Sequence, residues 1–118
     1  MTSTHSSKVL DDPSARGTET AAMAQWMIGE SHFHQKHYDE AIKAYHRVER
    51  LFDYPRWQAA SLLQAGKCYE AKGDWKQASQ LYAQLLKDYP DTTYTDEASK
   101  RLRAAQEGAA RPAAVRRN

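Results

Sequence analysis

Small, aromatic and aliphatic positions recur along this chain at a fixed distance. When the sequence is shifted by 37 residues, small residues fall on small ones and aromatic residues on aromatic ones. The matching pairs are Ala22 with Ala59, Gly29 with Gly66, Tyr38 with Trp75, Ala41 with Ala78, Tyr45 with Tyr82, and Val48 with Leu85. A further match, Asp53-Tyr54-Pro55 with Asp88-Tyr89-Pro90, has a shift of 35 residues. Periods of this length are typical of stacked supersecondary units.

In each repeat the sequence predicts two helices, and helix-capping or helix-breaking residues mark their ends. Gly73 followed by Asp74 is typical of a helix stop and a new N-cap. Pro55 and Pro90 interrupt the helices because proline has no backbone N–H to donate. His37 occupies the equivalent turn of the first repeat and is a weaker stop. The expected helices span about 20–36, 38–52, 56–72 and 75–87, followed by a fifth helix over about 92–107.

Composition agrees with an all-α fold. The better helix formers Ala, Gln, Lys, Arg, Glu and Leu dominate, and the β-branched residues that strands favour are few. A chain of 118 residues has room for one domain. We expect that domain at residues 19–107. It would lie between a disordered segment, residues 1–18, which has almost no apolar side chains, and a disordered basic tail, residues 108–118.

The repeated positions resemble the motif of the tetratricopeptide repeat (TPR) family. That motif has a small residue in the middle of the first helix, an aromatic residue opening the second, and then Ala, an aromatic residue and Pro. The matching residues are Gly29, Tyr38, Ala41, Tyr45 and Pro55, and then Gly66, Tyr69, Trp75, Ala78, Tyr82 and Pro90. The resemblance implies an α-solenoid of two helix-turn-helix repeats, about 20–55 and 56–90, plus a C-terminal capping helix. Gln25 and His32 depart from the motif.

The repeat ends resemble those of a narrower group. The segments YHRVERLFDYP and YAQLLKDYPDTTYTDEA are similar to bacterial cell-envelope TPR proteins, including the Tol-Pal coordinator and the outer-membrane assembly lipoprotein. This implies the periplasm or cell envelope if the chain is part of a longer protein. As written, the N-terminus lacks a secretory signal, so the chain would stay in the cytoplasm. No apolar run approaches the roughly 20 residues of a membrane span.

The two ends of the predicted stack differ in polarity. The fifth helix carries Lys100, Arg101 and Arg103 beside a small apolar side, so it can act as a polar cap. The first helix begins with AAMAQWMI and is apolar nearly all round, as buried helices usually are. We therefore expect Met23, Trp26 and Met27 to be covered by a second copy, by a partner protein or by preceding repeats. The alternative is a tolerable exposed patch.

The resemblance to TPR proteins also implies a concave face, lined by the first helix of each pair, that accepts peptide. Together with the apolar first helix, it assigns as candidate protein-binding residues Met23, Trp26, Met27, Glu30, Phe33, His34, Leu63, Lys67 and Glu70. Trp26 and Phe33 could equally pack between the repeats. Family members that clamp a terminal carboxylate use Asn with Lys or Arg. This chain has no Asn before Asn118, which argues against that mode of binding.

Side chains that could bind a metal ion or act in catalysis have simpler structural explanations. His32, His34 and His37 cluster at a helix end, but no third ligand stands at a clear spacing from the pair His34 and His37. Cys68 lies in mid-helix, where a core thiol is the simpler interpretation. Adjacent acids stand in first helical turns, where the helix dipole favours them, at Asp39-Glu40 and Asp96-Glu97. We predict no enzyme activity, no cofactor, no metal site and no small-molecule substrate.

The excess of basic over acidic residues lies in the C-terminal tail. The net charge is +2, but Arg111, Arg116 and Arg117 lie within residues 108–118. Without that tail the chain has 14 basic and 15 acidic residues, a net charge of −1, which argues against a nucleic-acid platform.

We therefore predict a non-catalytic scaffold that binds a polypeptide segment, or its own copy, through helix-lined surfaces. The alternative is a structural C-terminal capping piece of a longer cell-envelope TPR protein, with no ligand of its own.

Overall fold

Five helices form the part of the chain that the structure, a computed structural model, describes, residues 18–110. No strand occurs within these residues. The helices are α2 (Glu19–His34), α3 (Tyr38–Leu51), α4 (Pro55–Ala71), α5 (Trp75–Asp88) and α6 (Thr95–Ala110). This arrangement confirms the all-α, TPR-like fold. The expectations of a disordered segment before residue 18 and of a basic tail after residue 110 lie outside the described residues.

The turns within the two repeats have the same geometry. Gly73 takes the left-handed backbone conformation, with φ of 80°, and so does Lys36, with φ of 64°. In each turn the following amide closes a loop onto the preceding helix: His37 N donates to His32 O, and Asp74 N donates to Tyr69 O, both at 2.8 Å. Lys36 thus occupies the position of Gly73, although a side chain there is strained. The first helix therefore ends at His34, two residues earlier than expected.

Capping explains where several helices begin. The Thr18 side-chain oxygen accepts a hydrogen bond from the backbone N–H of Ala21 at 3.1 Å. Asp74 accepts one from Gln77 N at 3.3 Å, as the sequence predicted for an N-cap at this residue. Pro55 is the first residue of α4, a position where its missing N–H has no intrahelical partner to lose.

Helix α6 differs most from its expected bounds. It begins at Thr95, three residues later than predicted, because residues 90–94 form a turn after α5. It ends at Ala110, so Gly108, which was assigned to the tail, is helical. A Cβ built on Gly108 would lie 2.8 Å from Cδ2 of Trp75. The close packing of α6 against Trp75 therefore continues into the segment that composition alone marked as loose.

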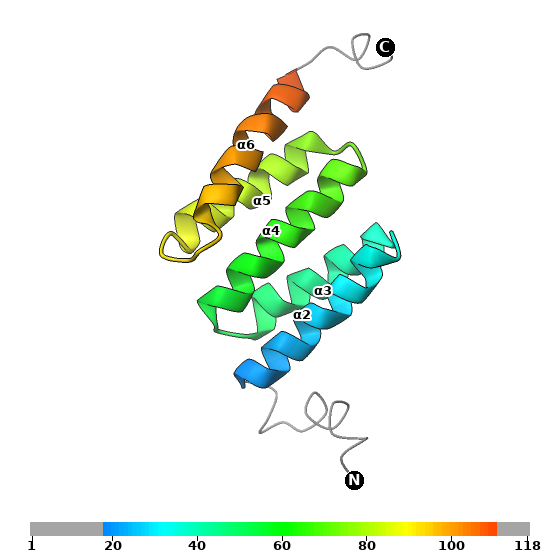
Figure 1. The fold of residues 1–118 in the computed structure, drawn as a ribbon, viewed down its shortest axis with the longest axis vertical. Coiled ribbons are helices and arrows are strands. Elements are labelled where there is room, and N and C mark those ends of the chain that lie inside the picture. Colours follow the sequence, from blue (N-terminus) through cyan, green and yellow to red (C-terminus); the bar gives the residue numbers. More distant parts are fainter. Residues whose placement is uncertain (1–17, 111–118) are drawn as a thin grey trace.

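Consecutive helices pack side by side in chain order, from α2 to α6 (Figure 1). The described part is an elongated stack with extents of 56 × 30 × 17 Å. Helices α2 and α4 also touch each other directly. None of the helices within residues 18–110 is long and apolar enough to cross a membrane.

A glycine in each repeat lets two helices approach closely. A Cβ on Gly29 would lie 2.5 Å from the ring of Tyr45, and one on Gly66 would lie 2.4 Å from the ring of Tyr82. Both tyrosines are completely buried. The core they belong to is otherwise small and aliphatic, with Ala41 and Ala78 fully buried. The glycine and aromatic positions matched in the sequence are thus the positions where the paired helices meet.

Candidate protein-binding surface

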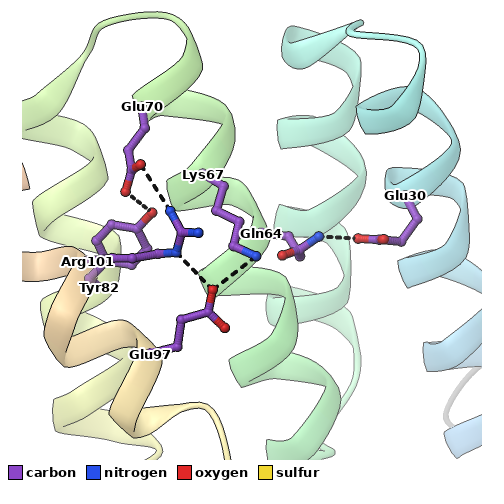
Figure 2. Close-up of polar contacts among 7 residues, drawn as sticks. All are labelled: Glu30, Gln64, Lys67, Glu70, Tyr82, Glu97 and Arg101. Atoms are coloured by element: carbon purple, nitrogen blue, oxygen red, sulfur yellow. Dashed lines mark hydrogen bonds and ion pairs between the residues drawn. The ribbon is translucent and has the colours of Figure 1, made fainter.

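Polar side chains from α2, α4 and α6 lie across one side of the stack (Figure 2). At its α2 end, Glu30 accepts hydrogen bonds at 2.6 Å from the Tyr45 hydroxyl and from Nε2 of Gln64. The Glu30 side chain is 19% exposed, so these two bonds hold a largely buried carboxylate in place. The bond from Gln64 also links the first helices of the two repeats.

A second cluster joins α4 to α6 on the same side. Nη1 of Arg101 lies 3.2 Å from Oε1 of Glu70, and its Nε lies 2.9 Å from Oε2 of Glu97. Nζ of Lys67 completes the cluster at 3.2 Å from the same oxygen of Glu97. The Tyr82 hydroxyl donates to Glu70 from the core side. We call the surface formed by Glu30, Gln64, Lys67, Glu70, Glu97 and Arg101, together with Met23 and Met27, the α2–α4–α6 face.

Burial and hydrogen bonding shift the pKa values of Tyr45, Tyr82 and Glu97 in these clusters. Burial, reinforced by the hydrogen bond to Glu30, raises the pKa of Tyr45 above its ordinary value. Burial and the bond to Glu70 do the same for the pKa of Tyr82. Hydrogen bonding by Arg101, with help from Lys67, lowers the pKa of Glu97. The hydroxyls therefore remain donors and the Glu97 carboxylate remains charged, as the contacts between helices require.

Exposed apolar side chains accompany the polar ones. Met23 is 38% exposed and Met27 56% exposed, one helical turn apart on α2. Met23 borders a pocket of about 160 Å³ between α2 and α4, which Arg56 and Trp57 also line. Glu19 accepts hydrogen bonds at 3.0 Å from both of these α4 residues. An apolar group can therefore rest on α2 beside this pocket.

The predicted binding residues fall into three groups. Met23, Met27, Glu30, His34, Lys67 and Glu70 contribute to the α2–α4–α6 face or border it. Trp26 and Phe33 are half-buried and pack against other rings, with centroid distances of 5.5 Å to Trp57 and 6.0 Å to Tyr38. Leu63 is only 3% exposed and belongs to the core. Its neighbour Gln64 is the α4 side chain that bonds across to α2.

Sequence reasoning did not assign three residues of this face to binding, Gln64, Glu97 and Arg101, and a signal existed for two of them. Arg101 lies 37 residues after Gln64, which is the repeat distance. Both side chains reach back to a glutamate on the preceding first helix, Glu30 for Gln64 and Glu70 for Arg101. Extending the repeat comparison into the fifth helix would have paired them. Ile28 of α2 is 40% exposed, although the sequence did not single it out, whereas Trp26 is half-buried.

The residues considered for metal binding or catalysis are His32, His34, His37 and Cys68, and of these only His34 borders this face. Within residues 18–110 no three His, Cys, Asp or Glu side chains are grouped so that they could hold a metal ion. The rings of His32 and His37 are 6.2 Å apart, and His34 lies 3.8 Å from Glu30. Cys68 is fully buried, and burial raises its pKa to about 12. Its thiol is therefore protonated and packed in the core, a poor state for a nucleophile.

Comparison with known proteins agrees with the repeat geometry. Residues 20–91 match the family model of the tetratricopeptide repeat. The chain belongs to the tetratricopeptide repeat family. Repeats of this family generally mediate protein–protein interaction, and its members are typically non-catalytic. Searches of the curated proteins and of the solved structures returned no match.

Proposed function

We propose that this protein is a non-catalytic scaffold that binds a polypeptide segment on the α2–α4–α6 face. The observation that carries the proposal is the exposure of Met23 and Met27, which stand seven and three residues before Glu30 and so share its side of α2. Glu30 begins the row of polar side chains that Figure 2 shows across α2, α4 and α6. Methionine adapts its shape to varied apolar partners. A bound segment would place an apolar side chain over these methionines and the pocket beside Trp57.

The charged groups of the face contribute more to the selectivity for a ligand than to its affinity. Glu30, Glu70 and Lys67 already have partners within the protein, so a ligand cannot bind them without competing with existing bonds. Leaving such a half-buried charge unpartnered is costly. Most of the affinity would therefore come from Met23 and Met27, and the polar row would select segments with matching hydrogen-bonding groups.

The test is selection of peptides from a displayed random library on the full chain, followed by affinity measurement for the selected peptides. Met27→Glu should weaken binding about tenfold or more, since it places a charge where an apolar contact is expected. Leu51→Glu is the matched control, because Leu51 is 59% exposed on α3, outside the face. Equal loss in both variants, or amide shift changes away from α2, α4 and α6, would contradict the proposal.

A second function is favoured by the packing of α6. Ala98 and Ala105 are fully buried against the stack, whereas Lys100 and Arg103 are exposed. A helix of this kind suits the C-terminal end of a longer cell-envelope TPR protein, in which the chain would be a capping piece with no ligand of its own. Repeats encoded in frame upstream of this segment would support that function. Peptide selection that enriches no sequence dependent on Met27 would favour it as well.

A further inference from the structure

An open groove lies between α2 and α3, the first two helices of the stack. Its volume is about 510 Å³, and the residues that line it all belong to these two helices. Ile28 of α2 and Ala44 of α3 contribute apolar surface, and Ile28 is 40% exposed. The groove is separate from the α2–α4–α6 face, because none of the residues that define that face lines it.

The second repeat shows what occupies the equivalent surface. The 37-residue shift carries Ile28 onto Ala65, which is 1% exposed because α4 packs against α3. It carries Arg47 onto Gln84, whose Nε2 lies 3.5 Å from Oε2 of Glu49 on α3. In the second repeat, this surface is therefore covered by a helix that presents a carboxylate to position 84.

The first repeat has more positive charge on this surface than the second. Lys43, Arg47 and Arg50 line the groove at helical spacing along α3. In the repeat alignment, the 37-residue shift pairs them with Gln80, Gln84 and Lys87 of the second repeat. None of the three forms a salt bridge within residues 18–110, and Glu40 is the acidic side chain that lines the groove with them. The groove thus combines an apolar floor with a basic rim.

We propose that this groove docks an amphipathic helix of another polypeptide, with its apolar side on Ile28 and Ala44 and its acidic residues paired with Lys43, Arg47 and Arg50. The first and last of the three cations are seven residues apart on α3, which is roughly 10 Å along the helix axis. Carboxylates one and two turns apart on the docking helix match that spacing. Burial of Ile28 supplies apolar contact, and the charge pairs set which helices are accepted.

A second copy of this chain fits the groove less well than an acidic partner. Helix α6, at the other end of the stack, has three acidic and three basic residues, so it offers no net negative charge. Two copies joined through the same groove would bring two sets of Lys43, Arg47 and Arg50 together, which like-charge repulsion opposes. Charge complementarity therefore assigns the groove to a foreign acidic helix.

The experiment uses the full chain and two synthetic 18-residue helical peptides that share a leucine stripe. One peptide carries Glu beside the stripe and the other carries Lys at the same positions. We expect the Glu peptide to bind about tenfold or more tightly than the Lys peptide, with amide shifts at Ile28, Ala44 and Arg47. The double variant Lys43→Glu with Arg47→Glu should reverse that preference. Both side chains are exposed, so the fold tolerates the exchange.

Lys87→Glu is the matched control, because Lys87 is the exposed second-repeat counterpart of Arg50, and it should leave both affinities unchanged. Four results would overturn the proposal. They are equal affinity for the two peptides, shifts centred on the α2–α4–α6 face, dimerisation of the free chain that buries Ile28, and Arg47-dependent binding to phosphatidylserine vesicles without binding to the Glu peptide. The variants Lys43→Glu and Arg47→Glu lie outside the α2–α4–α6 face. A negative result with them would therefore not bear on the scaffold function, which the Met27→Glu variant tests separately.

Discussion

At the residue scale, the missing Cβ atom of a glycine lets the paired helices approach closely. Gly66→Val should destabilise the protein by about 1–3 kcal/mol, because a Cβ there would lie 2.4 Å from the buried ring of Tyr82. Urea unfolding followed by circular dichroism measures the loss. The matched control is Ala83→Val, at an exposed position inside α5, where only helix propensity changes, by about 0.5 kcal/mol. Similar losses for the two variants would show that the glycine is not needed for close packing.

The repeat comparison identified Gly66 as a close-packing position. It did not show how the fold accommodates a residue that departs from the family motif. Gln25 stands where the family motif has a large apolar residue. Its side chain is instead 7% exposed, and Nε2 donates to the backbone oxygen of Ala44 at 3.3 Å. The bond satisfies a buried amide that would otherwise be costly. No local pattern predicts it, because Ala44 lies on the next helix.

At the scale of elements, α6 is joined to α4 through a carboxylate whose charge depends on pH. Hydrogen bonding by Arg101 lowers the pKa of Glu97 below its ordinary value near 4.5. A group whose pKa is lower in the folded state stabilises the fold above its unfolded pKa and loses that effect as pH falls through the folded value. The stability difference between the natural protein and Glu97→Gln should therefore be full above about pH 5 and vanish at more acidic pH.

Unfolding by urea at pH 7 and pH 3 measures this difference. We expect up to about 1 kcal/mol at pH 7, since partly exposed ion pairs contribute little more. Asp96→Asn is the control, because Asp96 is exposed and forms no salt bridge within residues 18–110. A Glu97→Gln effect that is independent of pH would mean that the ion pair between Glu97 and Lys67 does not join α4 to α6.

The bounds of α6 show why elements are harder to predict than repeats. Asp91 and Thr92 follow Pro90 and have the composition of an N-cap, yet the helix begins at Thr95. In the observed turn, the Thr92 hydroxyl donates to Tyr89 O at 3.0 Å. The same residue types serve caps and turns, since both need a side chain that bonds nearby backbone. Packing on Trp75, absent from any local pattern, extends the other end of the helix to Ala110.

At the scale of the whole molecule, Cys68 reports on opening of the stack. It is fully buried, and burial raises its pKa to about 12. A thiol reagent at pH 8 should therefore react at least about 1,000-fold more slowly with the folded chain than with the chain in denaturant. Spectrophotometric labelling measures both rates. Rapid labelling of the folded protein would show that the centre of the stack opens readily.

The same test separates local from global opening. Gly66→Val should speed labelling, since it destabilises the helix pair beside Cys68, whereas Ala83→Val should change the rate little. Because each helix in such a stack touches mainly its neighbours, stability is carried by adjacent contacts rather than by one central core.

The sequence by itself determined the repeat, the all-α class and the positions where small residues meet aromatic ones. It could do so because those features are periodic, and a helix pair that packs on its neighbour needs the same residue types each time. Tertiary structure alone decided that Leu63 is buried while Gln64 bonds to Glu30, and that α6 is held by Arg101 and Trp75. It also decided which side of α2 and α3 remains open. These features depend on the angle and depth at which helices far apart in the chain pack, and no pattern of neighbouring residues encodes that geometry.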